Sequence, residues 1–139
     1  MTELKNNLLF ELINFCSSNK IQRLEEMFEG ELAVMAYLLT TDKVTATDIS
    51  LKFNVSKARV TAIVTSLIKK EFLFVEKDKE DARKSLIKLS FNGKKYIENK
   101  LNDLDLELIN FLEKFGYEKS KILVELLQEV NSLLKEGEI

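Results

Sequence analysis

The sequence contains no histidine, no proline, one cysteine and four glycines among its 139 residues. Without histidine, Ser-His and Cys-His nucleophile pairs, histidine acid–base chemistry and histidine-containing zinc sites are excluded. A single cysteine cannot form an intrachain disulfide, which excludes a secreted disulfide scaffold. The scarcity of proline and glycine disfavours collagen-like, linker-rich and turn-rich all-β chains. There is no Gly-rich phosphate loop or metal-binding cluster either, so we predict no enzyme, no cofactor and no metal.

Long apolar runs are also missing, and no segment reaches the length that spans a membrane. Residues 1–20 carry acidic side chains within their apolar stretch and no small-residue cleavage site, so they are not expected to be a signal peptide. Hydrophobic residues make up 45% of the chain and charged residues 32%. This balance allows the chain to bury a core, and its length predicts one domain, or one small domain with helical extensions. The single cysteine and the lack of a spanning segment or signal peptide predict a reduced, cytoplasmic protein.

The net charge of −2 conceals a strongly basic middle. Residues 43–95 carry 13 Lys and Arg against 6 Asp and Glu, so the two flanking segments are acidic. A basic segment of this kind favours contact with a polyanion. Lys-rich surfaces are also common on solvated helices, so the charge split alone leaves both interpretations open.

Apolar residues at helical spacing predict helices before the basic middle. Leu4, Leu8 and Leu12 begin such a stripe, a polar break follows at residues 17–20, and a second stripe continues to Phe28. Gly30 then separates these helices from another over residues 31–40.

Two further helices and a tight turn are predicted from residue 45 onward. Thr45 and Asp48 have the spacing of a capping box, and Asn54 suits the left-handed exit of the short helix. Ser56 caps the next helix, which runs to about Lys70. Its predicted buried stripe consists of Val60, Ile63, Val64, Leu67 and Ile68, and its other side of Lys57, Arg59, Thr61, Ala62, Thr65, Ser66 and Lys69. Because the outer residues are small, polar or basic, this helix-turn-helix favours close approach to a DNA groove over a solvated face.

A β-hairpin is predicted to follow directly. Residues 72–75 are expected to form a buried strand, residues 76–84 a charged tip, and residues 85–89 a second strand with Ile87 and Leu89 on one face. This is the arrangement of a wing, although a hairpin could also serve only as a lid on the helices. Four cations at or beside the tip favour contact with phosphate, namely Lys77, Lys79, Arg83 and Lys84.

The C-terminal part predicts two long amphipathic helices. Ser90 can cap the first, in which Ile97, Leu101, Leu104, Leu108, Phe111 and Phe115 form a heptad seam. Gly116 ends it, and the last helix carries a stripe that includes Leu126 and Val130. In a monomer this apolar surface would be exposed to solvent, so we predict a homodimer. The residues predicted to hold it include Leu8, Leu12, Leu101, Leu104, Leu108, Phe111, Leu126 and Val130. An intrachain helical hairpin is the alternative.

The predicted fold is therefore mainly α with a small β-wing. It comprises an N-terminal helical part of the dimerisation region (1–30), a winged helix-turn-helix (31–95) and C-terminal dimerisation helices (96–139).

Several motifs in this region resemble MarR-type transcriptional regulators. They are Val44–Ile49, Asn54–Ser56, Val60–Thr61, Leu67–Lys70, Asp78–Arg83 and Leu89–Lys94, within residues 31–97. The resemblance implies a homodimer that reads a pseudo-palindromic operator in double-stranded DNA, usually as a repressor, and that in many relatives releases DNA when a small-molecule effector binds. It implies that Ser56, Lys57, Ala58, Arg59, Thr61, Ala62 and Thr65 face DNA. It further implies that Arg83 enters the minor groove and that Asp81 braces the wing. The basic residues Lys69, Lys77, Lys79 and Lys84 are expected as further DNA contacts because of their charge.

The chain departs from the family pattern at three places. Glu71 stands where a glycine usually follows the recognition helix, and a left-handed conformation there costs about 1 kcal/mol. Val75 and Glu76 stand where the first wing strand often has arginine, and Ala62 replaces a usual basic residue.

The sequence names no effector. Some relatives sense peroxide through a cysteine, but Cys16 lies on the apolar stripe and is expected to be buried and inert. Phe, Tyr and Met side chains suit either a pocket for a lipophilic ligand or the core. Beside the DNA-binding regulator, a winged-helix protein-interaction module without specific DNA binding remains the competing hypothesis, favoured by the acidic total and by Val75 and Glu76.

Overall fold

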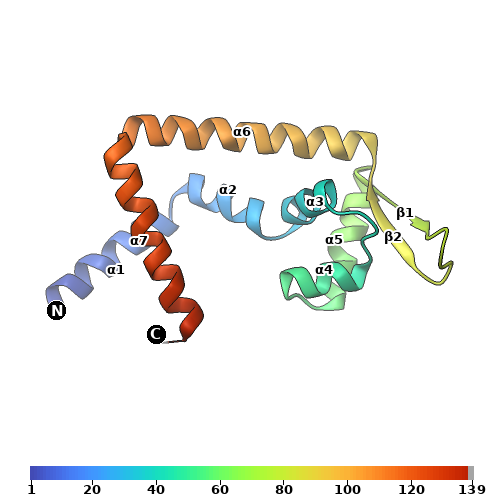
Figure 1. Cartoon of the computed structure of the whole chain (residues 1–139), viewed down its shortest axis with the longest axis horizontal. Helices are drawn as coiled ribbons and strands as arrows, with labels where there is room; N and C mark the ends of the chain where they lie inside the picture. Colours follow the sequence, from blue (N-terminus) through green and yellow to red (C-terminus); the bar gives the residue numbers. More distant parts are fainter. Residues whose placement is uncertain (138–139) are drawn as a thin grey trace. The chain divides into compact units, whose positions relative to one another are not determined.

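The computed structural model describes residues 1–137, and these fall into two compact units (Figure 1). The first unit, residues 1–99, contains α1 (Thr2–Cys16), α2 (Asn19–Phe28), α3 (Glu31–Thr40), α4 (Ala46–Phe53), α5 (Lys57–Lys69), β1 (Leu73–Lys77), β2 (Ser85–Leu89) and the first turns of α6 (Phe91–Phe115). The second unit begins at residue 100 and contains the rest of α6 and α7 (Tyr117–Glu136). The predicted order of helices and strands is confirmed. Among the described helices, none is both long and apolar enough to cross a membrane.

A small apolar core holds the winged part of the first unit together. Met35 of α3, Ile49 of α4 and Ile97 of α6 are fully buried, with Val60 and Leu67 of α5 almost so. Full burial of such a side chain contributes about 1.5–3 kcal/mol. One cluster therefore fixes α3, α4, α5 and the start of α6 together.

The predicted helix-turn-helix signals are present as hydrogen bonds. The Thr45 side chain accepts from the Asp48 backbone N–H, and the Asp48 carboxylate accepts from the Thr45 N–H at 2.8 Å, which completes the capping box. Asn54 adopts the left-handed conformation with φ of 51°, and Ser56 caps α5 by accepting from the Arg59 N–H. The Ser50 hydroxyl also donates to the Val55 carbonyl at 2.7 Å and closes the turn.

The wing differs from expectation in what it buries. The two strands pair antiparallel from Leu73 opposite Leu89 to Lys77 opposite Ser85. The predicted buried run begins one residue later than expected, and only Leu73 is buried in it, while Phe74 and Val75 are exposed. The reason is that Ile87 of β2 donates its N–H to the Val44 carbonyl at 2.8 Å. The loop before α4 thus covers β2, and β1 is left as the outer strand.

Two other burial predictions are wrong. Ile68 was expected in the buried stripe of α5 but is 41% exposed, because it lies on the flank of the helix that turns towards the outer face. Cys16 was expected to be buried and is exposed, because α1 buries none of its residues within this chain. Leu86 is buried, a position for which the alternating pattern of β2 gave no sign.

The terminal helices expose the apolar residues that were predicted to form a dimer interface. Leu8 and Leu12 of α1, Leu108 and Phe111 of α6, and Leu126 and Val130 of α7 are all exposed, and Leu101 and Leu104 are half-buried. Within the described chain, this large apolar surface has no cover.

Gly93, in the first turn of α6, packs directly on the backbone at the start of the wing. A Cβ atom placed there would lie 2.1 Å from the Phe72 carbonyl oxygen. Glycine in a helix is normally less stable than alanine by about 1 kcal/mol, so the contact reverses the usual preference at this position.

We expect Gly93→Ala to lower the free energy of unfolding by about 1–3 kcal/mol, because the backbone of the wing must move away from the new methyl group. Urea denaturation measures the change. The neighbouring, exposed Asn92→Ala is the control and should leave stability nearly unchanged. A Gly93→Ala protein as stable as the wild type would contradict the tight contact.

Candidate nucleic-acid interface

The outer face of α5 presents the side chains that were predicted to meet DNA. Seven of them are exposed, namely Lys57, Ala58, Arg59, Thr61, Ala62, Thr65 and Lys69, and the exposed Ser56 begins the helix. The buried stripe of Val60, Ile63 and Leu67 lies on the opposite side. The Thr61 hydroxyl donates to the Lys57 carbonyl at 3.0 Å, which leaves its oxygen and methyl group facing outward. The helix therefore offers a continuous surface of short side chains edged by cations.

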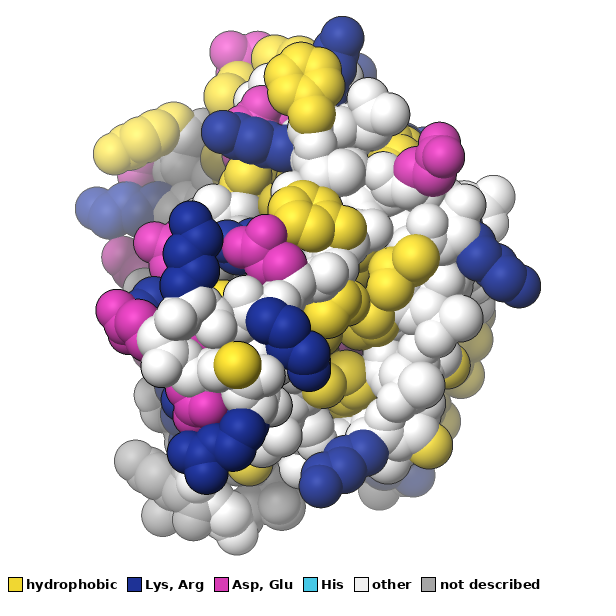
Figure 2. Space-filling model, turned by 90° about the vertical axis from the view of Figure 1, so that its right-hand side faces the viewer, with side chains coloured by type: hydrophobic (Ala, Val, Ile, Leu, Met, Phe, Trp, Pro, Cys, Tyr) yellow, Lys and Arg dark blue, Asp and Glu magenta, His cyan; other side chains and the backbone are white. Residues whose placement is uncertain are grey.

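The wing brings a second set of predicted residues to the same unit. Lys77, Lys79, Arg83 and Lys84 are all exposed at or beside the turn between the strands. Figure 2, which looks onto the wing end, shows lysine and arginine side chains intermingled with acidic ones on this face. Lys77 donates to the Ser85 hydroxyl at 3.1 Å. The acidic side chains Glu76, Glu80 and Asp81 therefore offset part of the positive charge on this face.

Asp81 holds the arginine of the wing, as the resemblance implied. Its carboxylate accepts from Arg83 Nε at 3.1 Å and from the Arg83 backbone N–H at 3.1 Å. These bonds, the side-chain one first, hold the pKa of the Asp81 carboxyl below its ordinary value. The Arg83 side chain is nevertheless 92% exposed. Asp81 thus orients the guanidinium and leaves it open to a further partner.

The departures from the family pattern have structural counterparts. Glu71 adopts the left-handed conformation, with φ of 61°. Glu76 forms an ion pair with Lys88 of the neighbouring strand, so it cancels a cation of the wing. Ala62 is exposed and adds no charge to the outer face of α5.

An ion pair between the wing tip and the loop before α4 was not predicted from the sequence. Lys43, with φ of 54°, donates from Nζ to the Glu80 carboxylate at 3.1 Å. This hydrogen bond, with the charges of Glu80 and Asp78, raises the pKa of Lys43. The partners are 37 residues apart, so no local signal in the sequence could have paired them.

A cavity of about 930 Å³ lies beside α5 within the first unit. Its walls include three glutamates at or just after the end of α2, one cation of α5 and one directly after it, two buried apolar side chains and two aromatic rings. They are Glu25, Glu26, Glu29, Arg59, Lys70, Met35, Leu67, Phe72 and Tyr96. Lys70 bonds Glu31 at 2.6 Å at this cavity. Burial raises the pKa of Glu31, but the hydrogen bonds from Lys70 and Ser66 and the Lys70 charge outweigh it, so the pKa lies below its ordinary value.

No group of three or more His, Cys, Asp or Glu side chains in residues 1–137 is placed to hold a metal ion. The fold and the exposed helix face together define the class of protein, a winged helix-turn-helix.

Comparison with known proteins gives the family. Residues 29–85 match the sequence profile of the MarR family. The HTH-type transcriptional regulator PchR of Bacillus subtilis (strain 168) is 32% identical over 90 residues, which cover 63% of this chain and 53% of that protein. The chain thus spans about half the length of the curated relative that it matches. Within residues 29–85 the chain thus matches the MarR family, which confirms the resemblance drawn from its motifs.

Solved structures share the fold over most of the chain. MepR, a transcription regulator of the Staphylococcus aureus multidrug efflux pump MepA, is 20% identical with a TM-score of 0.71, over 92% of this chain and 97% of MepR. The YusO protein from Bacillus subtilis is 17% identical with a TM-score of 0.75, over 94% and 96%. A MarR-like transcriptional regulator from Thermotoga maritima is 26% identical with a TM-score of 0.65, over 96% of both chains.

Proposed function

We propose that this chain is a sequence-specific DNA-binding transcriptional regulator that acts in the cytoplasm as a homodimer on a pseudo-palindromic operator and represses transcription. The observation that carries the proposal is the outer face of α5, where every residue predicted to meet DNA is exposed. A MepR structure with this fold, 22% identical to the chain, has been solved as a DNA complex, with a TM-score of 0.62 over 86% of this chain and 98% of MepR.

The two surfaces would read DNA in different ways. Thr61, Thr65 and Ala62 on α5 carry methyl groups, and both threonines carry a hydroxyl oxygen that can accept a hydrogen bond, which suits base edges and thymine methyls in the major groove. Lys57, Lys69 and the wing lysines suit phosphates, which fix position and contribute little to sequence choice. Arg83, held by Asp81, suits a narrow minor groove beside the site.

We expect Arg83→Ala to weaken operator binding by about 1–3 kcal/mol without unfolding the domain, because its side chain contacts no core residue. Asp81→Ala should have a smaller effect of the same sign, since the guanidinium stays but loses its orientation. Fluorescence anisotropy with a labelled operator measures both affinities at fixed salt.

Lys135→Ala provides the control, since it removes one exposed positive charge from α7, outside the proposed interface. If Arg83→Ala and Lys135→Ala lower operator affinity equally, Arg83 makes no specific contact with the operator. If the wild type binds operator and random duplex alike, the protein-interaction module becomes the better account.

The homodimer is supported by the apolar surface of the terminal helices. Leu108 and Phe111 of α6 and Leu126 and Val130 of α7 are each at least 43% exposed in the single chain. Each exposed Å² of apolar surface costs about 25 cal/mol relative to burial, so a second copy that covers these helices is strongly favoured. Two copies related by a two-fold axis would present two α5 helices, as a palindromic operator requires.

We expect Leu104→Glu combined with Leu108→Glu to dissociate or unfold the dimer, because four carboxylates would enter one apolar seam. Analytical ultracentrifugation at micromolar concentration measures the assembly. Leu51→Glu is the matched control, since Leu51 is 77% exposed on α4 and lies outside the seam. A well-folded monomeric wild type would refute the dimer.

We further propose that a small effector occupies the cavity beside α5 and releases DNA. Its acidic wall of Glu25, Glu26 and Glu29 and its aromatic wall of Phe72 and Tyr96 suit a lipophilic cation. Arg59 belongs both to this cavity and to the exposed face of α5, so an occupant would act on a residue that DNA also needs.

Tetraphenylphosphonium and tetraphenylborate test this charge preference, since they match in shape and have opposite charge. We expect the cation to bind and to lower operator affinity, and Glu25→Gln with Glu29→Gln to weaken its binding by about fivefold or more. Calorimetry and anisotropy measure the two effects. Equal binding of both ions would contradict the acidic site.

A further inference from the structure

The chain at the end of α5 and the chain at the start of α6 are locked together. The Ser90 hydroxyl donates to the Glu71 carbonyl at 2.6 Å and accepts from the Gly93 N–H at 3.0 Å. The Ser90 backbone N–H donates to the Phe72 carbonyl at 2.9 Å. We call Glu71, Phe72, Ser90, Gly93 and Tyr96 the α5–α6 joint.

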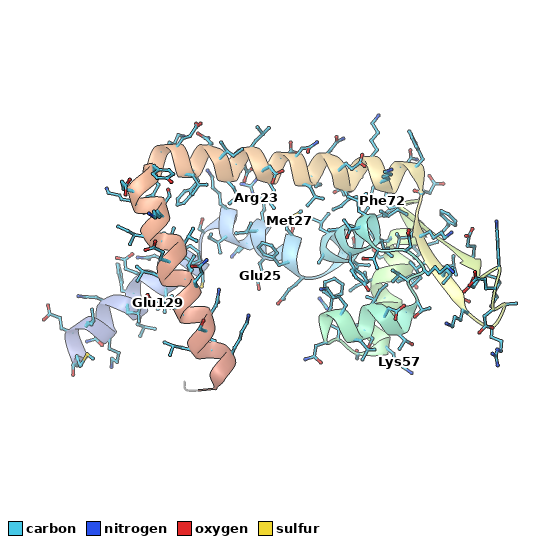
Figure 3. The ribbon with its side chains drawn as sticks, in the orientation of Figure 1. Arg23, Glu25, Met27, Lys57, Phe72 and Glu129 are labelled. Atoms are coloured by element: carbon cyan, nitrogen blue, oxygen red, sulfur yellow. The ribbon has the colours of Figure 1, made fainter. Side chains whose placement is uncertain are left out.

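The joint leaves little room for movement. The Phe72 N–H donates to the Leu67 carbonyl of α5 at 3.0 Å, so the strand start is tied to the helix. The Phe72 ring stacks on the Tyr96 ring of α6 with 4.5 Å between centroids and 21° between planes. The Gly93 backbone lies against the Phe72 carbonyl so closely that a Cβ has no space. Figure 3 shows Phe72 beside the first turn of α6 and Lys57 at the opposite end of α5.

The two helices that meet here have different proposed tasks. α5 carries the face proposed to read the operator, and α6 runs as one helix from Phe91 to Phe115 and carries the proposed dimer seam. A dimer-forming helix and a reading helix must keep one angle if the two copies are to reach both half-sites at once.

We propose that Ser90 is a positioning residue that acts through Glu71 and Phe72, fixes the angle between α5 and α6, and thereby sets the half-site spacing that the dimer accepts. This inference rests on the proposed function. The Ser90 hydroxyl is suited to the role because it bridges both segments, as donor to one and acceptor from the other. Removal of the hydroxyl leaves the hydrogen bond from the Ser90 N–H to the Phe72 carbonyl in place, so the α5–α6 joint becomes less rigid but stays connected.

Operator spacing reports this angle. Moving one half-site by a single base pair rotates it by about 36° around the duplex axis and shifts it by about 3.4 Å along that axis. A dimer with a rigid joint cannot follow both changes, whereas one with a loosened joint can follow part of them. A loosened joint should therefore lower the ratio of affinities between the best and the shifted spacings. Its effect on the affinity for the best site itself should be smaller.

The experiment measures affinity of full-length protein for the best operator and for versions with one base pair inserted or deleted between half-sites. We expect Ser90→Ala to reduce the ratio between best and shifted sites by about fivefold, the lower end of what the loss of its two side-chain hydrogen bonds allows. Ser90→Thr keeps the hydroxyl and should restore the wild-type ratio. Tyr96→Leu, which removes the ring stack at the protein surface, should reduce the ratio in the same direction even if Ser90→Ala folds poorly.

Ser50→Ala is the matched control. It removes a serine hydroxyl that donates to a backbone carbonyl at 2.7 Å in the same unit, away from the joint. We expect it to lower stability and affinity while the spacing ratio stays at the wild-type value.

Two results would overturn the inference alone. One is a folded Ser90→Ala protein that discriminates between spacings as sharply as the wild type. The other is a Ser50→Ala protein that loses as much discrimination as Ser90→Ala, since the effect would then be general destabilisation. A wild type that shows no preference for any duplex would instead refute the proposed function, and the inference with it.

Discussion

The close approach of Gly93 to the Phe72 carbonyl is the constraint on which the rest of the winged unit depends. It brings the first turn of α6 against the point where α5 ends and β1 begins. The left-handed Glu71 turns the chain sharply enough for this meeting, and Ile97 of α6 then reaches the buried core. The helix α5, the wing and the long helix α6 therefore share one point of attachment.

Local signals explain why much of this fold could be predicted from the sequence. Capping residues act over three or four positions, so Thr45 with Asp48 and Ser56 marked their helices correctly. Helical periodicity likewise identified the outer face of α5, because burial of Val60, Ile63 and Leu67 leaves only the opposite side for solvent. The residues of the candidate interface on this helix thus come from one short stretch of chain.

The features that escaped prediction depend on distant partners. An apolar run such as Phe74–Val75 has the same pattern on an outer strand as on a covered one. The bond from the Ile87 N–H to the distant Val44 carbonyl gives β2 a partner on its other edge and leaves β1 as the outer strand. The ion pair of Lys43 with Glu80 and the bond of Ser90 to the Glu71 carbonyl join residues 37 and 19 positions apart. Such contacts follow from the assembled fold and have no local signature.

The carboxylate beside Arg83 has a consequence for how the protein would search DNA. An arginine that already holds Asp81 gains less from an arbitrary phosphate, since each new contact must compete with the bond it has. Glu76 and Glu80 restrain Lys88 and Lys43 in the same way. On the proposed function, the wing therefore carries its own competing anions, and these would lower its affinity for random sequence more than for a groove whose shape fits Arg83.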